Sequence, residues 1–174
     1  MRKFIGLTLI FATIFMAHPL LANTNDRIKA KFMVDLAINH YASATDKAVA
    51  FENISDPDGK FRDNDIYMFV FNPVDRVMHA HGANMDFIGK PQLAKVGDKM
   101  LVDEIAAIAK PYGAWYSYEW QNPSTNMVES KTSLVRKFDG LIFALGFMIS
   151  RNLCLIASRH HRCMLNECCR MYQV

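Results

Sequence analysis

Residues 115–123 read WYSYEWQNP, with four aromatic side chains within six positions and a proline at the end. Successive side chains of a β-strand point to opposite faces of its sheet, so Tyr116, Tyr118 and Trp120 share one face and Trp115 lies on the other. Rings on one face either pack into a core or line a pocket for a small molecule. The stretch therefore predicts a strand over 114–121 and leaves both roles open.

Further strands are predicted on either side of this stretch. A turn over 122–126 leads to a strand over 130–138, and Asp139-Gly140 leads to a last strand over 141–149. Upstream, residues 67–71 are apolar on both faces, which is typical of a strand buried on both sides. Residues 76–81 return as its hairpin partner. The sequence thus predicts five antiparallel strands.

Helical periodicity is clearest near the N-terminus, over 23–42. Ile28, Phe32 and Leu36 recur every four residues there, with Met33 and Ile38 widening the stripe, and we expect this stripe to face the core. Shorter helices are predicted over 45–51 and 100–110. A helix on one face of an antiparallel sheet is α+β architecture.

The first 22 residues differ from the rest of the chain. A basic start is followed by an apolar run of about 14 residues, too short to span a bilayer, and Ala22 is a small residue at a cleavage position. These features predict a secretory signal peptide over 1–22, with an uncleaved membrane anchor as the alternative. The protein is then periplasmic or secreted.

Charge and cysteine usage restrict the remaining possibilities. Cleavage would remove Arg2 and Lys3 from a chain whose formal net charge is only +3, which argues against a nucleic-acid partner. The cysteines all lie near the C-terminus, so they do not form a disulfide framework through the domain. Residues 150–174 are rich in cysteine and arginine, and we expect them to be disordered. The domain proper is predicted to be 23–149.

Two segments carry a family resemblance. KFRDNDIYMFVFNPVDRVMHAHGANMDFIGK (60–90) and WYSYEWQNPSTNMVESKTSLVRKF (115–138) resemble, in order and spacing, the two halves of the single Cache pattern. The family shows Y-x-F-V and then V-x-x-H in the first half, and Y-x-W-x-N-P and then K-x-S-Y-V in the second. The chain departs from the pattern at Leu134, where the family has Tyr, and at Phe147-Met148, where the closing aromatic is displaced. Both positions can lie near the ligand in this family.

This resemblance implies a PAS-like fold and an extracytoplasmic sensor domain that binds a small organic molecule, often a short carboxylate. Most members belong to chemoreceptors or sensor kinases, whereas this chain resembles the stand-alone secreted form. A membrane signalling protein is then a possible partner. The alternative is a secreted interaction module with a vestigial pocket, recognised by such a partner.

The candidate ligand-binding residues follow from the aromatic stretch and the resemblance together. Tyr118 and Trp120 offer an O–H and an N–H beside large apolar walls. Lys131 and His81 match polar positions of the family pattern, and a buried carboxylate needs a cation or several donors. Trp115 completes the predicted set.

Metal binding and catalysis have little support in the sequence. His79 and His81 are two residues apart on a strand and should point the same way, but no Asp, Glu or Cys completes a metal site. G-x-S-x-G, H-E-x-x-H and P-loop motifs are absent. No cofactor and no enzymatic activity are therefore expected.

Overall fold

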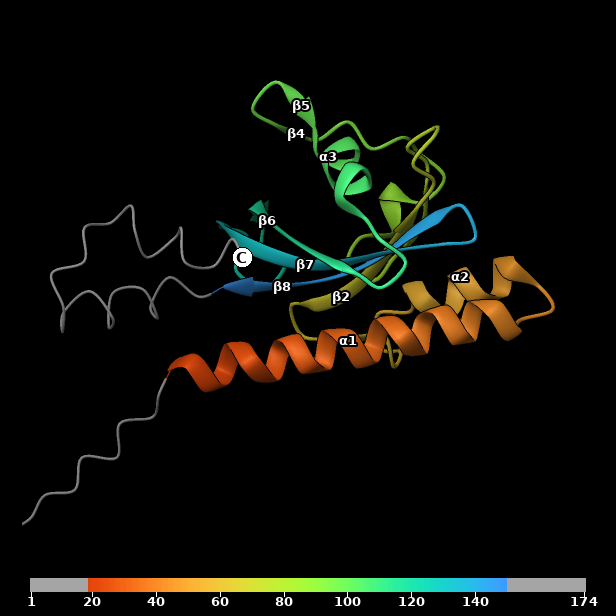
Figure 1. Cartoon of the computed structure of the whole chain (residues 1–174), viewed down its shortest axis with the longest axis horizontal. Coiled ribbons are helices and arrows are strands. Elements are labelled where there is room, and N and C mark those ends of the chain that lie inside the picture. Colours follow the sequence, from red (N-terminus) through yellow and green to blue (C-terminus); the bar gives the residue numbers. More distant parts are fainter. Residues whose placement is uncertain (1–18, 150–174) are drawn as a thin grey trace, which may run out of the picture.

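The computed structural model describes residues 19–149, and these form the predicted α+β fold (Figure 1). The main sheet is antiparallel, with strand order β1-β2-β8-β7-β6 and with β3 also paired to β2. The strands of this sheet are β1 (Arg62–Asp63), β2 (Ile66–Phe71), β3 (Met78–His81), β6 (Ala114–Gln121), β7 (Val128–Phe138) and β8 (Leu141–Ile149).

Five strand positions make up the width of this sheet, as predicted. β1 pairs with Ile66 and Tyr67, whereas β3 pairs with residues 69–71, and β8 takes the other edge of β2. The short β1 and β3 therefore share one edge. The aromatic stretch is β6, which pairs along its whole length with β7 in the hairpin that the turn at Asn122 closes.

Helices cover both faces of the sheet. The long α1 (Pro19–Ser43) and α2 (Lys47–Ser55) lie on one face, and α3 (Leu101–Ile108) packs on the other (Figure 1). A 3-10 helix, η1 (Met85–Phe87), and a small hairpin of β4 (Lys95–Val96) and β5 (Lys99–Met100) precede α3. A sheet buried on both faces explains why β2 is apolar throughout.

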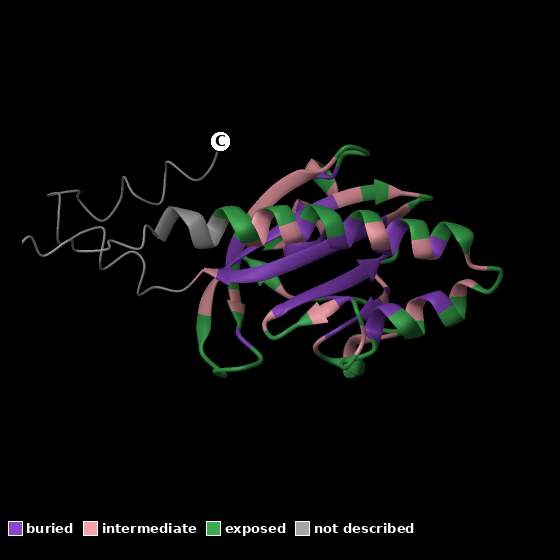
Figure 2. Ribbon diagram, turned by 90° about the horizontal axis from the view of Figure 1, so that it is seen from below, coloured by how far each residue is buried: buried purple, intermediate pink, exposed green. Residues whose placement is uncertain are grey.

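The predicted buried stripe of α1 is partly correct: Met33 and Ile38 are buried and Leu36 packs against the core, but the other two residues of the stripe are not buried. Ile28 and Phe32 are 62% and 65% exposed, and Figure 2 shows buried and exposed residues alternating along this helix above a buried sheet. The face that packs on the sheet consists of residues three and four apart, and its small side chains let the helix approach closely. These residues are Ala30, Met33, Val34, Ala37, Ile38 and Tyr41.

The junction between α1 and α2 is capped from both sides. The Lys47 ammonium donates to the Tyr41 carbonyl at 2.6 Å and to those of Ala42 and Ala44, carbonyls at the end of α1. Asp46 begins α2 by accepting a hydrogen bond from Ala48 N at 2.8 Å. The second helix thus starts where the sequence predicted.

The predictions for the two termini, a signal peptide over 1–22 and a disordered tail over 150–174, fall wholly or mostly outside the described residues. The tail 150–174 lies outside them, and so does most of the predicted signal peptide. The proposed cleavage after Ala22 falls within the backbone of α1, which begins at Pro19. Among the described residues, no helix combines the length and hydropathy of a membrane span.

Candidate functional site

A small cavity lies between the sheet and α3, on the face opposite α1. Its volume is about 30 Å³, against the roughly 10–15 Å³ that one water molecule needs, so it has room for a few non-hydrogen atoms. The wall is mostly apolar and comes from the sheet, the 82–100 segment and α3. The lining residues are Phe69, Met78, His81, Phe87, Gln92, Ala94, Leu101, Val102, Ile105, Tyr118, Trp120 and Lys131.

Lys131 enters this cavity by lying flat on the sheet. It stands opposite Tyr118 on β6 and is only 1% exposed. Its side chain crosses Gly146 of β8, where an added Cβ would come 2.1 Å from Lys131 Cε. The Nζ atom ends over the ring of Tyr67 on β2, 3.6 Å from its centroid. Gly146 therefore provides the space that lets Lys131 reach across β8 to β2.

The Lys131 amine is buried without a counter-ion at contact distance. Within residues 19–149 no carboxylate forms an ion pair with it and no acceptor receives its hydrogen bond. Desolvation lowers the pKa of Lys131 well below its ordinary value, while the charge of Asp65 acts weakly in the opposite direction. An anion that enters the cavity stabilises such a buried amine.

His81 presents its second nitrogen to the same space. Its Nδ1 accepts hydrogen bonds from the backbone N–H groups of Ala83 at 3.2 Å and Asn84 at 2.9 Å. The proton of the neutral ring is therefore on Nε2, which becomes a donor. Burial, and then the charge of Lys131, lower the pKa of His81 to about 3, so the imidazole is neutral at pH 7.

Aromatic rings of β6 and η1 enclose these two donors. The Tyr118 hydroxyl is hydrogen-bonded to Ser133 Oγ at 3.1 Å, and Trp120 packs edge-on against Tyr118 at 6.0 Å between centroids. Phe87 of η1 packs edge-on against His81 at 5.0 Å and reaches Trp120 at 6.5 Å. The predicted aromatic face thus forms one wall of a cavity and not only core.

The structure brings together His81, Tyr118, Trp120 and Lys131 but not Trp115. The ring of Trp115 lies on the helical side of the sheet, where it packs against Phe147 at 6.2 Å and under the Arg27 guanidinium at 4.5 Å. Strand alternation places it there, so its inclusion among the pocket residues was wrong. Leu134 and Phe147, where the chain departs from the family pattern, also belong to the helix-side core. These two departures do not alter the cavity wall, whereas Met148, the third position, pairs with Lys131 on the neighbouring strand.

His79 and His81 do not point the same way, contrary to the prediction. Phe71 pairs with Met78 but Val70 pairs with Ala80, so the register shifts and His79 is the extra residue of a β-bulge. As a result His79 stacks on Phe51 of α2 at 5.1 Å, while His81 faces the cavity. One metal ion therefore cannot be held by both imidazoles.

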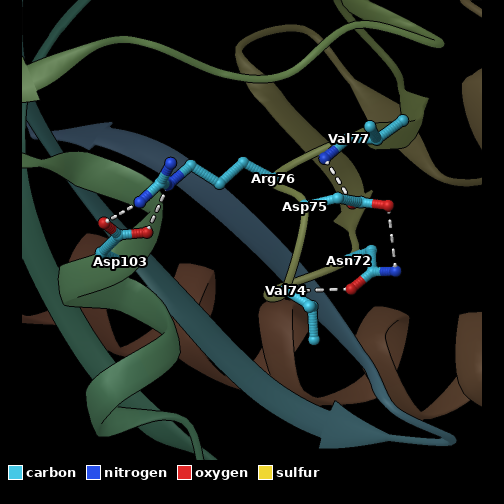
Figure 3. A network of polar contacts seen from close by, with 6 residues as sticks. All are labelled: Asn72, Val74, Asp75, Arg76, Val77 and Asp103. Atoms are coloured by element: carbon cyan, nitrogen blue, oxygen red, sulfur yellow. Dashed lines mark hydrogen bonds and ion pairs between the residues drawn. The ribbon is translucent and has the colours of Figure 1, made fainter.

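The far wall of the cavity could not be inferred from the aromatic stretch. It consists of Leu101, Val102 and Ile105 of α3, which an ion pair fastens to the β2–β3 turn. Figure 3 shows this contact: Arg76 meets Asp103 through two hydrogen bonds of 2.8 and 2.9 Å. The inward stripe of α3 was predictable from its spacing, but its position over Tyr118 was not.

Comparison with known proteins agrees with this geometry. No curated protein sequence matches the chain. A crystal structure of a methyl-accepting chemotaxis protein from Vibrio parahaemolyticus matches with a TM-score of 0.62 and 14% identity, over 76% of this chain and 94% of that one. A Cache chemosensory domain described for carboxylic acid recognition matches with a TM-score of 0.56 and 20% identity, over 78% and 100% of the two chains.

A periplasmic sensor domain of a chemotaxis protein has the same fold, with a TM-score of 0.50, 16% identity and coverage of 80% and 100%. At these identities the likeness concerns the fold. The family assignment rests on the sequence model of "Single Cache domain 2", which matches residues 35–146, more than half of the chain. The protein belongs to the single Cache domain 2 family of sensor domains.

Proposed function

We propose that this domain reversibly binds a short monocarboxylate in the cavity, with Lys131 and His81 as the donors to its carboxylate. The observation that carries the proposal is the Lys131 amine, 1% exposed and without an acceptor among the described residues. A carboxylate supplies the missing acceptor and charge, and Nε2–H of His81 supplies a second hydrogen bond.

The shape of the cavity supports a small ligand with one polar end. Lys131 and His81 are grouped around the rings of Tyr67 and Phe69, while Met78, Leu101 and Ile105 form an apolar region. A second carboxylate on the ligand would be buried without a partner there, which is costly. Carboxylic acid recognition by a structurally similar Cache domain agrees with this choice.

An occupied site is favoured over a vestigial pocket. An unpaired buried amine costs folding free energy, and an apolar residue of similar size would remove that cost. A bound anion offsets this loss of folding free energy, which explains a lysine at this position. Sensing, with no chemical turnover, is the function we propose for the domain, in a periplasmic or secreted chain that passes its ligand state to a membrane signalling protein.

A thermal-shift and calorimetric series tests the binding proposal. Acetate and propionate should raise the melting temperature and give saturable heats, because a ligand that binds only the folded state stabilises it. Acetamide has nearly the shape of acetate without its charge and should do neither. Succinate should bind more weakly than propionate. Equal responses to acetate and acetamide, or no response to any acid, would contradict a carboxylate site.

A further inference from the structure

The Lys131 amine has the surroundings of a nucleophile as well as those of an anion-binding group. Its side chain is held between Gly146 and Tyr67, so its Nζ faces the cavity and not solvent. An amine reacts with carbonyl compounds only through a free lone pair, which the ammonium form lacks. Desolvation in an apolar pocket is one way in which proteins keep a lysine unprotonated.

The rings of Tyr67, Phe69 and Trp120 face this amine, with centroids 3.6, 5.3 and 6.0 Å from Nζ, and attract its ammonium form, whereas most of its titratable neighbours are uncharged. His81 is neutral, because burial lowers its pKa to about 3. Burial raises the pKa of both Tyr67 and Tyr118, so these hydroxyls stay protonated. Asp65 is the charged neighbour, and its carboxylate accepts a hydrogen bond from Met148 N at 3.2 Å while forming no ion pair with Lys131.

We infer that Lys131 also binds short 2-oxo acids covalently, as a reversible imine. This inference rests on the proposed carboxylate site. The Nζ lone pair forms a bond to the carbonyl carbon, and the carbonyl oxygen takes up the two protons that the amine nitrogen loses. The carbon–oxygen bond then breaks and water leaves, so that one ligand and one lysine give one imine and one water. No oxidant or reductant is needed, and hydrolysis reverses the step.

The same contacts that suit a carboxylate orient an oxo acid for this addition. Nε2–H of His81 is available for the ligand carboxylate, which places the adjacent carbonyl carbon on the Lys131 side of the cavity. The cavity of about 30 Å³ admits a few non-hydrogen atoms, so glyoxylate and pyruvate are the ligand class of matching size. A plain carboxylate lacks the carbonyl and stays non-covalent. The domain would then release oxo acids more slowly than simple acids.

Reductive trapping tests the inference on the full exported chain. The protein is incubated near pH 7 with glyoxylate or pyruvate and sodium cyanoborohydride, which converts an imine into a stable secondary amine, and the adduct is located by peptide mass spectrometry. Lys137 of the same strand is exposed and serves as an internal control. Exposed lysines are almost fully protonated at this pH, so Lys131 should be modified at least about tenfold faster than Lys137.

Two variants and one competitor make the result specific. Lys131→Met should abolish the fast adduct, and Lys137→Met should leave it unchanged. Excess acetate should slow modification of Lys131 but not of surface lysines. Modification of Lys131 at the rate of Lys137 overturns the inference. If acetate still binds in calorimetry, the carboxylate site survives that result, and if acetate does not bind either, the proposed function fails as well.

Discussion

Lys131 and Gly146 occupy the same space on neighbouring strands: the lysine side chain lies where the side chain of any other residue at 146 would be. A Cβ at 146 would come 2.1 Å from Lys131 Cε, 2.5 Å from Ser133 Oγ and 3.1 Å from Lys131 Nζ. The backbone of Gly146 is an ordinary strand that pairs with Tyr67 and Ser133. The glycine is therefore required by the lysine and not by the backbone.

Gly146→Ala should displace Lys131 from the cavity and abolish carboxylate binding in calorimetry. We expect a loss of roughly 1–3 kcal/mol in the free energy of unfolding, as for other overpacked cores. Part of that loss should be recovered when Lys131→Ala is added, because residues in contact are not additive. Strictly additive losses in a urea-unfolding double-mutant cycle would mean that the two residues do not share this space.

Lys131→Met should remove affinity for acetate without weakening the fold. Affinity should fall by about 2–4 kcal/mol, because one partner of a buried charged contact is lost. Stability in the absence of ligand should stay the same or rise, because an unpaired buried amine is replaced by an apolar chain of similar length. Lys137→Met, at an exposed position of β7, should change neither quantity. A clear loss of stability in Lys131→Met alone would show that the amine contributes to folding.

Acetate binding should take up a proton. Burial lowers the pKa of the amine in the empty site, whereas a bound carboxylate favours the ammonium form, so binding shifts the amine towards its charged state. The binding enthalpy measured near pH 7 should therefore depend on the ionisation enthalpy of the buffer, and affinity should fall as pH rises. Identical enthalpies in phosphate and Tris would mean that Lys131 is already charged before binding.

Substitution of each tryptophan by alanine should separate effects on ligand binding from effects on stability. Trp120 lines the cavity, whereas Trp115 packs on the opposite face of the same strand. Trp120→Ala should lower both affinity and stability, and Trp115→Ala should lower stability alone. Each loss of stability should be less than the roughly 3–5 kcal/mol of a fully buried ring, because both side chains are partly exposed. Loss of acetate affinity in Trp115→Ala would contradict the assignment of faces.

Much of the fold was predictable because its strands alternate cleanly. The period of two in β2 and β6 correctly separated the pocket face, with Phe69 and Tyr118, from the helix face. The same rule failed at His79, where one extra residue in β3 reverses the direction of the side chains. A bulge has no marker in this sequence, so no count along the strand could have found it.

The helix and the polar site were harder to predict, for a different physical reason. In α1 the buried face is rotated from the predicted stripe. Met33 and Ile38 lie on it, whereas the large residues Ile28 and Phe32 are exposed, and the small residues Ala30 and Ala37 permit close packing on the sheet. Likewise, lysines at strand ends are usually solvated, and only the resemblance pointed to Lys131 as a site residue. Its burial depends on the absence of a side chain at Gly146, on the next strand of the sequence.

The pH dependence of stability should report the two buried bases. Lys131 and His81 have lower pKa values in the folded chain than in the unfolded one, so between those values the unfolded chain binds more protons and the free energy of unfolding rises with pH. For His81 this interval runs from about 6.5 down to about 3, and for Lys131 it opens below the ordinary value of 10.5. Each group contributes at most about 1.4 kcal/mol per pH unit inside its interval.

One substitution at each residue should remove the pH dependence of stability in its pH interval. His81→Asn keeps an acceptor for the N–H groups of Ala83 and Asn84 but does not titrate, so urea unfolding should depend less on pH between 3 and 6.5. Lys131→Met should flatten the alkaline side instead, and it should narrow the acid interval, because it removes the charge of Lys131 that helps to lower the pKa of His81. Stability curves of either variant that run parallel to the parent across its interval would show that the corresponding group is not buried as a neutral base.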